Sequence, residues 1–213
     1  MKIKEIFYTL QGEGRNWGMP AVFVRVGDCN LRCTFCDTDF LTDLKEMTPG
    51  EVADEVVKIA GSCRNVVFTG GEPLLQQVDL AEVMGLLSDM DEWYFAVETN
   101  GTVAITCEEF SFWIDWICCS PKVPIQMIKL DRAHELKIVF TAVQRWWAKP
   151  YEEFPAQFFY ITPEAPSANP YARNDADRSA WPGLAGVQTI VEFVKENPKW
   201  RLNLQSHKIL GLR

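Results

Sequence analysis

Three cysteines near the amino terminus have the residue type and the spacing of an iron-binding loop. Cys29, Cys33 and Cys36 follow the pattern Cys-x3-Cys-x2-Cys, and soft thiolate ligands select iron–sulfur iron and zinc. A structural zinc site takes four protein ligands and an electron-transfer cluster takes four cysteines, but no fourth cysteine or histidine lies nearby in the sequence. We therefore expect a [4Fe-4S] cluster with one open iron position, at which a small molecule can bind. A zinc loop is the alternative.

A glycine-rich turn follows about forty residues later, at the end of a predicted strand. Thr69-Gly70-Gly71-Glu72-Pro73 comes directly after Phe68; two glycines let the backbone approach a ligand closely, and Glu72 supplies an acceptor. The turns Val97–Gly101 and Ser120–Lys122 follow the next two predicted strands. Each turn taken alone is more often a simple turn. In a parallel α/β arrangement, however, all of them lie at the carboxyl edge, where ligands bind, so their order predicts one shared site.

These segments resemble the radical S-adenosylmethionine (SAM) superfamily, in which an aromatic residue precedes the last cysteine as Phe35 does here and a Gly-Gly-Glu-Pro turn follows. The resemblance implies that SAM chelates the open iron and that one-electron reduction cleaves SAM to a 5′-deoxyadenosyl radical. It also implies a set of SAM-binding residues from the cluster loop and the later turns: Phe35, Cys36, Asp37, Gly70, Gly71, Glu72, Glu98, Ser120, Pro121, Lys122 and Thr162.

Within that superfamily, four segments resemble 7-carboxy-7-deazaguanine synthases: Phe7–Gly14, Pro20–Arg25, Cys36–Thr38 and Gln205–Lys208. The resemblance extends over the whole chain. It implies a radical ring contraction of 6-carboxy-5,6,7,8-tetrahydropterin to 7-carboxy-7-deazaguanine and ammonia, a carbon–nitrogen lyase reaction that feeds deazapurine pathways such as queuosine biosynthesis. It further implies a homodimer that uses SAM and Mg²⁺ and takes electrons from a flavodoxin- or ferredoxin-type reductant.

The same resemblance, with the chemistry of the side chains, gives a set of substrate-binding residues: Leu10, Gln11, Gly12, Glu13, Arg25, Thr69, His207 and Arg213. An amide and a carboxylate in the turn at 11–13 suit the donor–acceptor edge of a pterin. Arg25 stands in an apolar strand and suits a substrate carboxylate, with an internal salt bridge to a glutamate as the alternative. By resemblance, the terminal carboxylate of Arg213 folds back to the pterin; a frayed tail is the alternative.

Two further assignments concern Mg²⁺ and the remaining polar side chains. The resemblance implies that the Thr38 hydroxyl ligates Mg²⁺, whereas the preference of Mg²⁺ for hard oxygen ligands makes Asp37 the more obvious choice, so both stay open. His207 and Lys208 are expected to position substrate rather than to exchange protons. The other cysteines lie in or beside apolar stretches and are interpreted as packing residues: Cys63, Cys107, Cys118 and Cys119.

Short apolar stretches alternate with helical periodicity along the chain, which predicts an α/β fold with a mainly parallel sheet. The resemblance refines this to a truncated TIM-like barrel of about six mainly parallel strands with few helices. Thr48-Pro49-Gly50-Glu51 forms a capping box that predicts the start of one helix, and apolar periodicity predicts two more, at 80–87 and at 187–194. The predicted strands are Ala21–Val26, Asn65–Phe68, Trp93–Val97, Asp115–Cys119, Leu136–Phe140, Phe158–Ile161 and Arg201–Gln205.

Composition limits the remaining possibilities. The chain has 213 residues, 47% hydrophobic and 23% charged, which suits a single soluble domain; we expect one radical SAM domain over 1–213, with the C-terminal tail in the substrate pocket. A net charge of −8 argues against a nucleic-acid surface, so an anionic substrate needs a few placed cations, for which Arg25, Lys122 and Lys137 are candidates. No stretch reads as a membrane span or a signal peptide, so a cytoplasmic protein is expected.

Two alternatives to the synthase remain at this point. A radical SAM activase, which acts on a glycyl radical protein, shares the cluster but should lack the Leu10–Glu13 turn. A non-enzymatic zinc module would also explain three cysteines. The stretch Pro163–Gly183 is rich in Pro, Asn, Ala and Asp and is expected to be a long loop, either a cover for the site or a plain surface loop.

Overall fold

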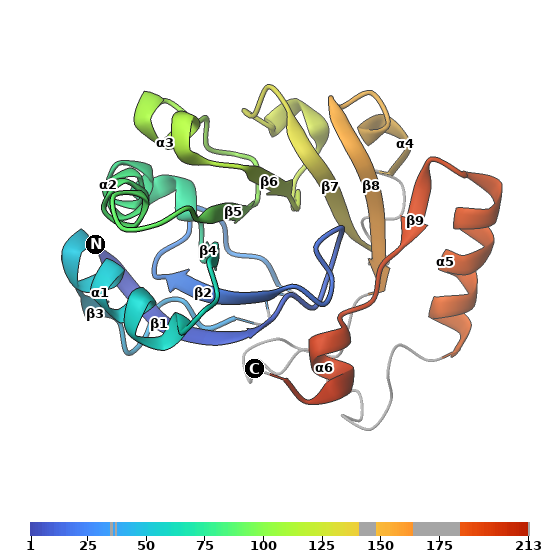
Figure 1. Cartoon of the computed structure of the whole chain (residues 1–213). Helices are drawn as coiled ribbons and strands as arrows, with labels where there is room; N and C mark the ends of the chain where they lie inside the picture. Colours follow the sequence, from blue (N-terminus) through green and yellow to red (C-terminus); the bar gives the residue numbers. More distant parts are fainter. Residues whose placement is uncertain (35, 37, 141–147, 164–183, 213) are drawn as a thin grey trace.

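A computed structural model of the chain describes residues 1–34, 36, 38–140, 148–163 and 184–212. At its centre is a nine-stranded sheet in the order β3-β1-β2-β4-β5-β6-β7-β8-β9. The sheet curves round without closing, so that β1 and β2 face β7, β8 and β9 across an open interior (Figure 1). The truncated barrel expected from the sequence is confirmed in form, with nine strands in place of about six.

All seven predicted strands are present, and from β2 to β9 each neighbouring pair is parallel. The first strand, β1, was not predicted. It pairs antiparallel with β2, and its register shifts between Ile3 and Glu5, which breaks the two-residue alternation by which a strand is recognised. The strands are β1 Lys2–Leu10, β2 Pro20–Val26, β3 Lys45–Glu46, β4 Asn65–Gly70, β5 Tyr94–Thr99, β6 Trp116–Cys119, β7 Ala133–Phe140, β8 Ala156–Pro163 and β9 Trp200–Leu202.

The three predicted helices are confirmed as α1, α2 and α5. The capping box forms as expected: the Glu51 amide donates to Thr48 Oγ1 at 3.2 Å, and the Thr48 amide donates to Glu51 Oε2 at 2.7 Å. Three short helices, α3, α4 and α6, have too few turns to leave a periodic signal. The helices are α1 Pro49–Ala60, α2 Gln77–Ser88, α3 Glu108–Trp113, α4 Ala148–Tyr151, α5 Leu184–Glu196 and α6 Ser206–Leu210, with 3-10 turns at Pro73–Gln76 and Ile125–Met127.

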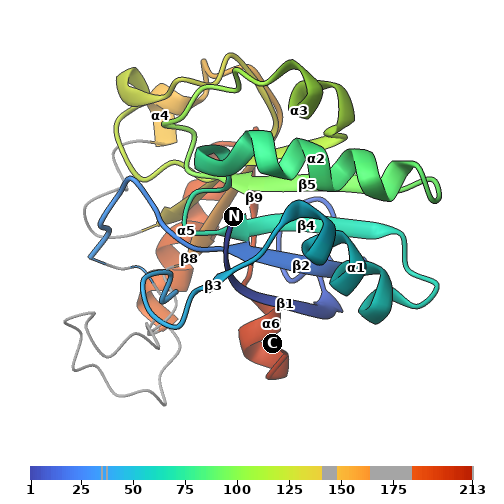
Figure 2. The ribbon, with the colours of Figure 1, turned by 90° about the vertical axis from the view of Figure 1, so that its left-hand side faces the viewer.

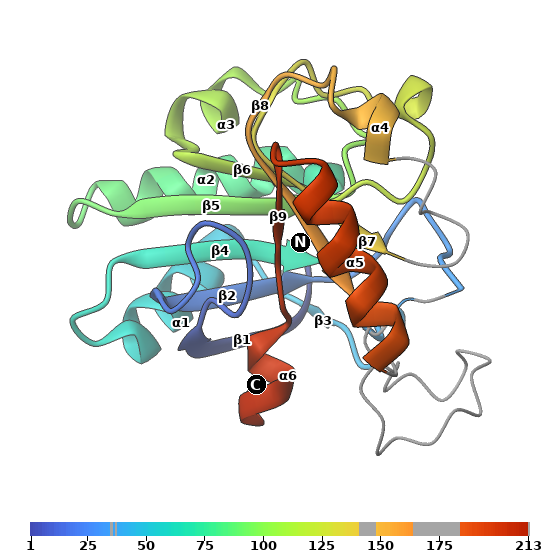
Figure 3. The same cartoon turned by 90° about the vertical axis from the view of Figure 1, so that its right-hand side faces the viewer.

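Helices cover the outer face of the sheet. Figure 2 shows α1 and α2 lying along the strands of the amino-terminal half, and Figure 3 shows α5 beside β8 and β9. Apolar residues of alternate strand positions, such as Val24, Phe68 and Val97, pack there against Val56 of α1 and Leu80 of α2. This outer layer is the main core, which leaves the inner face of the sheet to polar residues and to a small apolar cluster: Phe7, Ala21, Phe23, Val67 and Ala96.

The loop between β1 and β2 reaches the segment that follows β9 and so bridges the first and last parts of the sheet (Figure 3). The Gly14 amide donates to Asn203 Oδ1 at 2.8 Å, the Ser206 amide donates to the Gly12 carbonyl at 3.1 Å, and Trp17 Nε1 donates to Ser206 Oγ at 2.6 Å. These bonds hold residues nearly two hundred positions apart at one end of the interior. None of the described helices is long and apolar enough to cross a membrane.

Candidate active site

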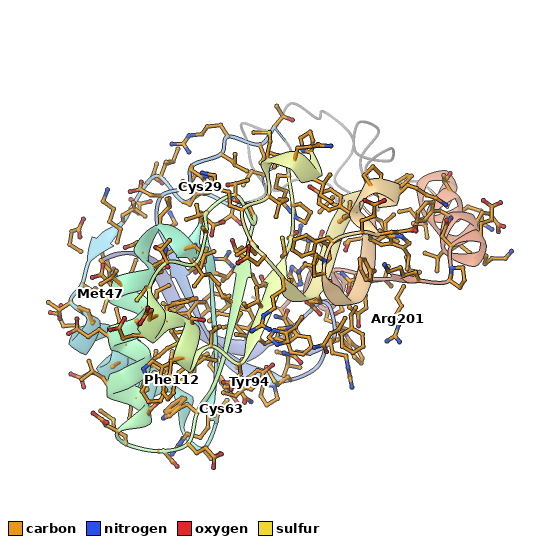
Figure 4. The ribbon with its side chains drawn as sticks, turned by 90° about the horizontal axis from the view of Figure 1, so that it is seen from above. Cys29, Met47, Cys63, Tyr94, Phe112 and Arg201 are labelled. Atoms are coloured by element: carbon orange, nitrogen blue, oxygen red, sulfur yellow. The ribbon has the colours of Figure 1, made fainter. Side chains whose placement is uncertain are left out.

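A cavity of about 360 Å³ occupies the interior of the curved sheet. The cluster loop, which follows β2, lines it at the carboxyl edge of that strand. The turn before β2 and three residues that follow β9, Gln205, His207 and Lys208, also line it. In Figure 4, Cys29 marks the carboxyl edge, opposite Cys63 and Tyr94, which lie near the starts of β4 and β5. The cavity therefore joins the expected cluster end to the expected substrate end.

The three loop cysteines are half-buried and line this cavity. Burial raises the pKa of Cys29 and of Cys33, so their protons must leave when iron binds. Among the residues that the structure describes, no three His, Cys, Asp or Glu side chains are grouped to hold a metal ion. Thiolates of a [4Fe-4S] cluster bind separate iron atoms, so they need not converge on one point as ligands of a single ion do. The donor set thus fits the cluster.

The Gly70-Gly71 turn packs directly against the cluster loop. The Gly71 amide donates to the Val26 carbonyl at 3.1 Å and the Glu72 amide to the Asp28 carbonyl at 2.9 Å. A Cβ atom on Gly71 would collide with the Asp28 carbonyl, and Gly70 has a φ of +123°, a region that disfavours other residues. Both glycines line the cavity, so the turn brings bare backbone to the expected SAM position.

Glu72 lies under this turn and outside the cavity lining. Its Oε1 accepts from the Leu74 amide at 3.1 Å and from Thr99 Oγ1 at 2.6 Å, and its Oε2 accepts from the Asn100 amide at 2.8 Å. Burial raises the pKa of this carboxyl group in spite of these donors. The structure therefore gives Glu72 a role in joining the turn after β4 to the turn after β5, and its contact with SAM stays a prediction.

The remaining residues of the expected SAM set do not all line the cavity. Ser120 and Lys122 line the cavity, with Lys122 Nζ donating to Ser120 Oγ at 2.7 Å. Pro121 is buried outside the lining, and Thr162 is buried where its hydroxyl accepts from Asn203 Nδ2 at 2.8 Å. Phe35 and Asp37 lie outside the described residues, whereas Cys36 and Thr38 both line the cavity.

Glu98 stands between the two ends of the cavity. Its Oε1 accepts from Gln11 Nε2 at 3.0 Å, and its Oε2 accepts from Thr69 Oγ1 at 3.1 Å. Both donors belong to the expected substrate set, whereas Glu98 was expected to contact the SAM ribose. The sequence separates these residues by up to 87 positions, and the parallel order of β2, β4 and β5 brings them together.

Lys137 of β7 provides a buried cation at the substrate end. Its ammonium lies 3.0 Å from Glu13 Oε2 and 3.6 Å from Glu98 Oε1. Glu13 also accepts from Gln205 Nε2 at 3.0 Å and from Asn203 Nδ2 at 3.2 Å. Burial alone would raise the pKa of Glu13, but the Lys137 charge and the Gln205 hydrogen bond outweigh it and the pKa is lowered. Glu13 is therefore an ionised, oriented acceptor.

Arg25 lines the cavity but already has a protein partner. Its Nε donates to Glu5 Oε1 at 2.9 Å, and its guanidinium lies 5.6 Å from the centre of the Phe7 ring. The side chain is 22% exposed. The internal salt bridge to a glutamate, which was the alternative from the sequence, is thus present because the unpredicted strand β1 places Glu5 opposite Arg25. Binding of a substrate carboxylate by Arg25 stays a prediction.

The other expected substrate residues line the cavity as well, namely Leu10, Gln11, Gly12, Thr69 and His207. A Cβ atom on Gly12 would collide with the His207 side chain, so this glycine permits the imidazole to lie against the turn. Arg213 is outside the described residues. Lys137, which the sequence offered as a candidate cation for an anionic substrate, also lines the cavity. Sequence reasoning gave no role to several other lining residues, which carry no local signal: Phe7, Thr9, Phe23, Asn100 and Gln205.

An open parallel sheet with a three-cysteine loop and a glycine turn at its carboxyl edge is the arrangement of a radical SAM domain, and the model of the radical SAM superfamily matches residues 24–114. Curated relatives extend the similarity over the whole chain. A 7-carboxy-7-deazaguanine synthase of Bacteroides thetaiotaomicron is 37% identical, covering 100% of this chain and 98% of that protein. One of Burkholderia multivorans is 35% identical, covering 99% and 98%. The chain belongs to the 7-carboxy-7-deazaguanine synthase family.

The fold agrees with this assignment. The crystal structure of QueE from Escherichia coli matches with a TM-score of 0.68 at 24% identity, covering 95% of this chain and 92% of that one. Both resemblances drawn from the sequence are therefore confirmed, and the radical SAM family brings with it a [4Fe-4S] cluster and SAM. The activase alternative is not favoured, since the full-length relatives carry the synthase name.

Proposed function

We propose that this chain converts 6-carboxy-5,6,7,8-tetrahydropterin to 7-carboxy-7-deazaguanine and ammonia, as a carbon–nitrogen lyase. The observation that supports this most directly is the two-ended cavity. Three thiols line one end, and the other end holds the fixed amides of Gln11 and Gln205 and the carboxylate of Glu13. Such acceptors and donors suit the edge of a 2-amino-4-oxo pyrimidine ring.

The residues of the chain have separate parts in this reaction. Cys29, Cys33 and Cys36 hold the cluster, and the backbone at Gly70-Gly71 lies against SAM, which supplies hydrogen-abstracting radical chemistry when bound and reduced. Gln11 and Glu13 orient the pterin ring, and Arg25 holds its carboxylate. Because a displaced substrate would not meet the radical, positioning decides the rate.

We also propose Thr38 as the protein ligand of Mg²⁺. Its position two residues after Cys36 and in the cavity lining supports this, although carboxylates are the commoner protein ligands of this ion. Thr38→Ala should raise the Mg²⁺ concentration needed for half-maximal turnover and leave the iron content unchanged. An unaltered Mg²⁺ dependence would leave Asp37 as the ligand to test.

The single domain proposed for 1–213 is completed by its carboxyl-terminal segment, since Gln205, His207 and Lys208 line the cavity. We propose that it functions as a homodimer supplied with electrons by a flavodoxin- or ferredoxin-type protein. Support for a dimer comes from exposed apolar side chains on β1, the β1–β2 loop and α6, including Tyr8, Trp17, Ile209 and Leu210. Leu210→Glu should convert the dimer to a monomer in sedimentation analysis; an unchanged mass would place the contact elsewhere.

The experiment that tests the function is anaerobic turnover. Reconstituted enzyme should contain about four irons per chain and should form 7-carboxy-7-deazaguanine from the pterin with SAM, Mg²⁺ and a reductant. Deuterium at C6 of the substrate should appear in SAM. SAM cleavage that never consumes the pterin would contradict the synthase, and zinc in place of iron would contradict the cluster.

Cysteine variants provide the matched comparison. Alanine at Cys29, Cys33 or Cys36 should remove the iron and the SAM cleavage. Cys107→Ala is the control, because Cys107 lies near Glu109 on the outer side and does not line the cavity. Loss of iron in Cys107→Ala would show that the loss is not specific to the loop.

A further inference from the structure

Lys137, to which the proposed reaction assigns no role, is buried at the proposed substrate end of the cavity. Lys137 is 6% exposed, and its ammonium lies between Glu13 of the β1–β2 loop and Glu98 of β5, at 3.0 and 3.6 Å. Gln11 donates to Glu98 and its Oε1 accepts from the Glu13 amide at 3.2 Å. The lysine, the two carboxylates and the amide form a closed ring of contacts.

The groups that face Lys137 are mostly acidic. Strand pairing sets Glu98 beside Cys118 and Cys118 beside Glu135, and it sets Lys137 beside Tyr160 of β8. Burial opposes the charge of Lys137, but the acidic groups around it raise its pKa well above the usual value. The charged and titratable groups that face this site are Glu13 from the β1–β2 loop, Glu98 from β5, Cys118 from β6, Glu135 from β7, Tyr160 from β8 and His207 from α6.

We propose that Lys137 is a positioning residue for substrate recognition, whose ammonium holds the carboxylates of Glu13 and Glu98 in the orientation that the pterin requires. This inference rests on the proposed function. Glu98 in turn accepts a hydrogen bond from the side-chain amide of Gln11. One cation thus fixes the side chains of Glu13, Glu98 and Gln11 around the proposed substrate position.

Charge explains why the cation is required. Two carboxylates that share one ammonium lie close together, and without the ammonium one of them would take up a proton. Breaking a buried ion pair from one side leaves an uncompensated charge, which is strongly unfavourable. The substrate also carries a carboxylate, so a cavity with uncompensated Glu13 and Glu98 would repel it. Arg25, the proposed anchor of the substrate carboxylate, forms its ion pair with Glu5, so the charges of Glu13 and Glu98 are left to Lys137.

The test compares Lys137→Met with Lys137→Arg, which keeps the charge, in steady-state kinetics across pH. We expect Lys137→Met to raise KM for the pterin about tenfold or more while KM for SAM stays unchanged. The acid limb of kcat/KM should move to higher pH, because burial then dominates the pKa of Glu13. Lys137→Arg should keep the acid limb of the wild-type enzyme.

A second variant guards against misfolding. Lys137→Met/Glu98→Gln removes the cation together with one carboxylate, so it should fold more readily than the single variant and regain part of the affinity for the pterin. No recovery in the double variant, or a wild-type KM and acid limb in Lys137→Met, would overturn the proposal. A rise in KM for SAM equal to that for the pterin would do so too, since it would indicate general loss of structure.

One readout does not depend on turnover. The pKa of Glu13, followed by carboxyl-carbon NMR in the pterin-free protein, should rise in Lys137→Met and stay low in Lys137→Arg. If the wild-type enzyme fails to consume the pterin, the proposed function fails, whereas the titration still reports whether Lys137 controls Glu13. An unchanged Glu13 pKa in Lys137→Met would overturn the positioning role by itself.

Discussion

The carboxylate of Glu72 has a structural role that its sequence motif does not show. Glu72 was expected to bind SAM, yet its two oxygens accept from Thr99 Oγ1 and from the Leu74 and Asn100 amides. A charge-assisted bond from a backbone amide is among the stronger ones in a protein. Glu72 therefore fixes the turn after β4 relative to the turn after β5.

Gly71 gives the first prediction. Gly71→Ala should abolish SAM binding and lower the iron content, because the added methyl group collides with the Asp28 carbonyl and pushes the cluster loop from the turn. Iron analysis and equilibrium binding of SAM measure this. Gly50→Ala is the control: a Cβ there meets nothing within 4 Å, so it should bind iron and SAM normally. Normal SAM binding by Gly71→Ala would show that the cluster loop can move to accommodate the added methyl group without loss of the site.

Arg25 gives the second prediction. Arg25→Ala should raise KM for the pterin and lower kcat, because the substrate carboxylate loses its anchor and C6 moves from the radical. SAM binding should change little. Arg64→Ala is the matched control, since Arg64 forms an ion pair with Asp91 at 2.6 Å away from the cavity lining. Unchanged kinetics in Arg25→Ala would mean that the ion pair with Glu5 is its whole purpose.

Among the elements, α1 shows how a local signal stabilises the scaffold. Backbone amides in the first turn of a helix have no acceptor within the helix, and the capping box supplies acceptors for two of them. Val52 and Val56 on one face are fully buried against the outer side of the sheet. The helix thus supports β1 and β2, between which the turn at residues 11–13 lies.

Thr48→Ala should lower the free energy of unfolding by about 1 kcal/mol, because the Glu51 amide loses its acceptor. Urea unfolding followed by circular dichroism measures the change. Thr106→Ala, at an exposed position before α3, should stay within about 0.5 kcal/mol of the wild-type protein. Equal destabilisation by both variants would remove the cap as the explanation.

For the molecule as a whole, the open sheet leaves its first and last strands unpaired with each other. The β1–β2 loop bridges this gap through Asn203, which bonds to the Gly14 amide, to Glu13 and to Thr162. Asn203 is 6% exposed. Water therefore has little access to its partners, and loss of the Asn203 side chain would leave them without a hydrogen bond. The same bridge completes the substrate end of the cavity.

Asn203→Ala should therefore destabilise the protein by about 1–3 kcal/mol, the usual consequence of leaving buried partners unsatisfied. Hydrogen exchange at the Gly14 amide should accelerate, and KM for the pterin should rise as Glu13 loses a donor. Asn197→Ala removes an amide bond to the Phe193 carbonyl at the end of α5 and should affect stability alone. Slow exchange at Gly14 in Asn203→Ala would contradict the bridging role.

The sequence by itself determined the features that depend on local pattern. Cys29, Cys33 and Cys36 lie within one loop, so their spacing pointed to a cluster without tertiary information, with a zinc loop as the alternative. The seven predicted strands, β2 and β4 to β9, are short apolar stretches, and the three longer helices have the apolar periodicity of a helix buried on one face. The family followed from short motifs in the correct order.

The tertiary structure decided which side chains meet across strands. The register of β1 against β2 pairs Glu5 with Arg25, and the curvature of the sheet brings Lys137 to Glu13, which lies 124 residues earlier. Neither contact leaves a signal in the sequence, because a charge in an apolar strand shows only that a partner is needed. Which partner it finds depends on strand order and register, and these result from packing over the whole molecule.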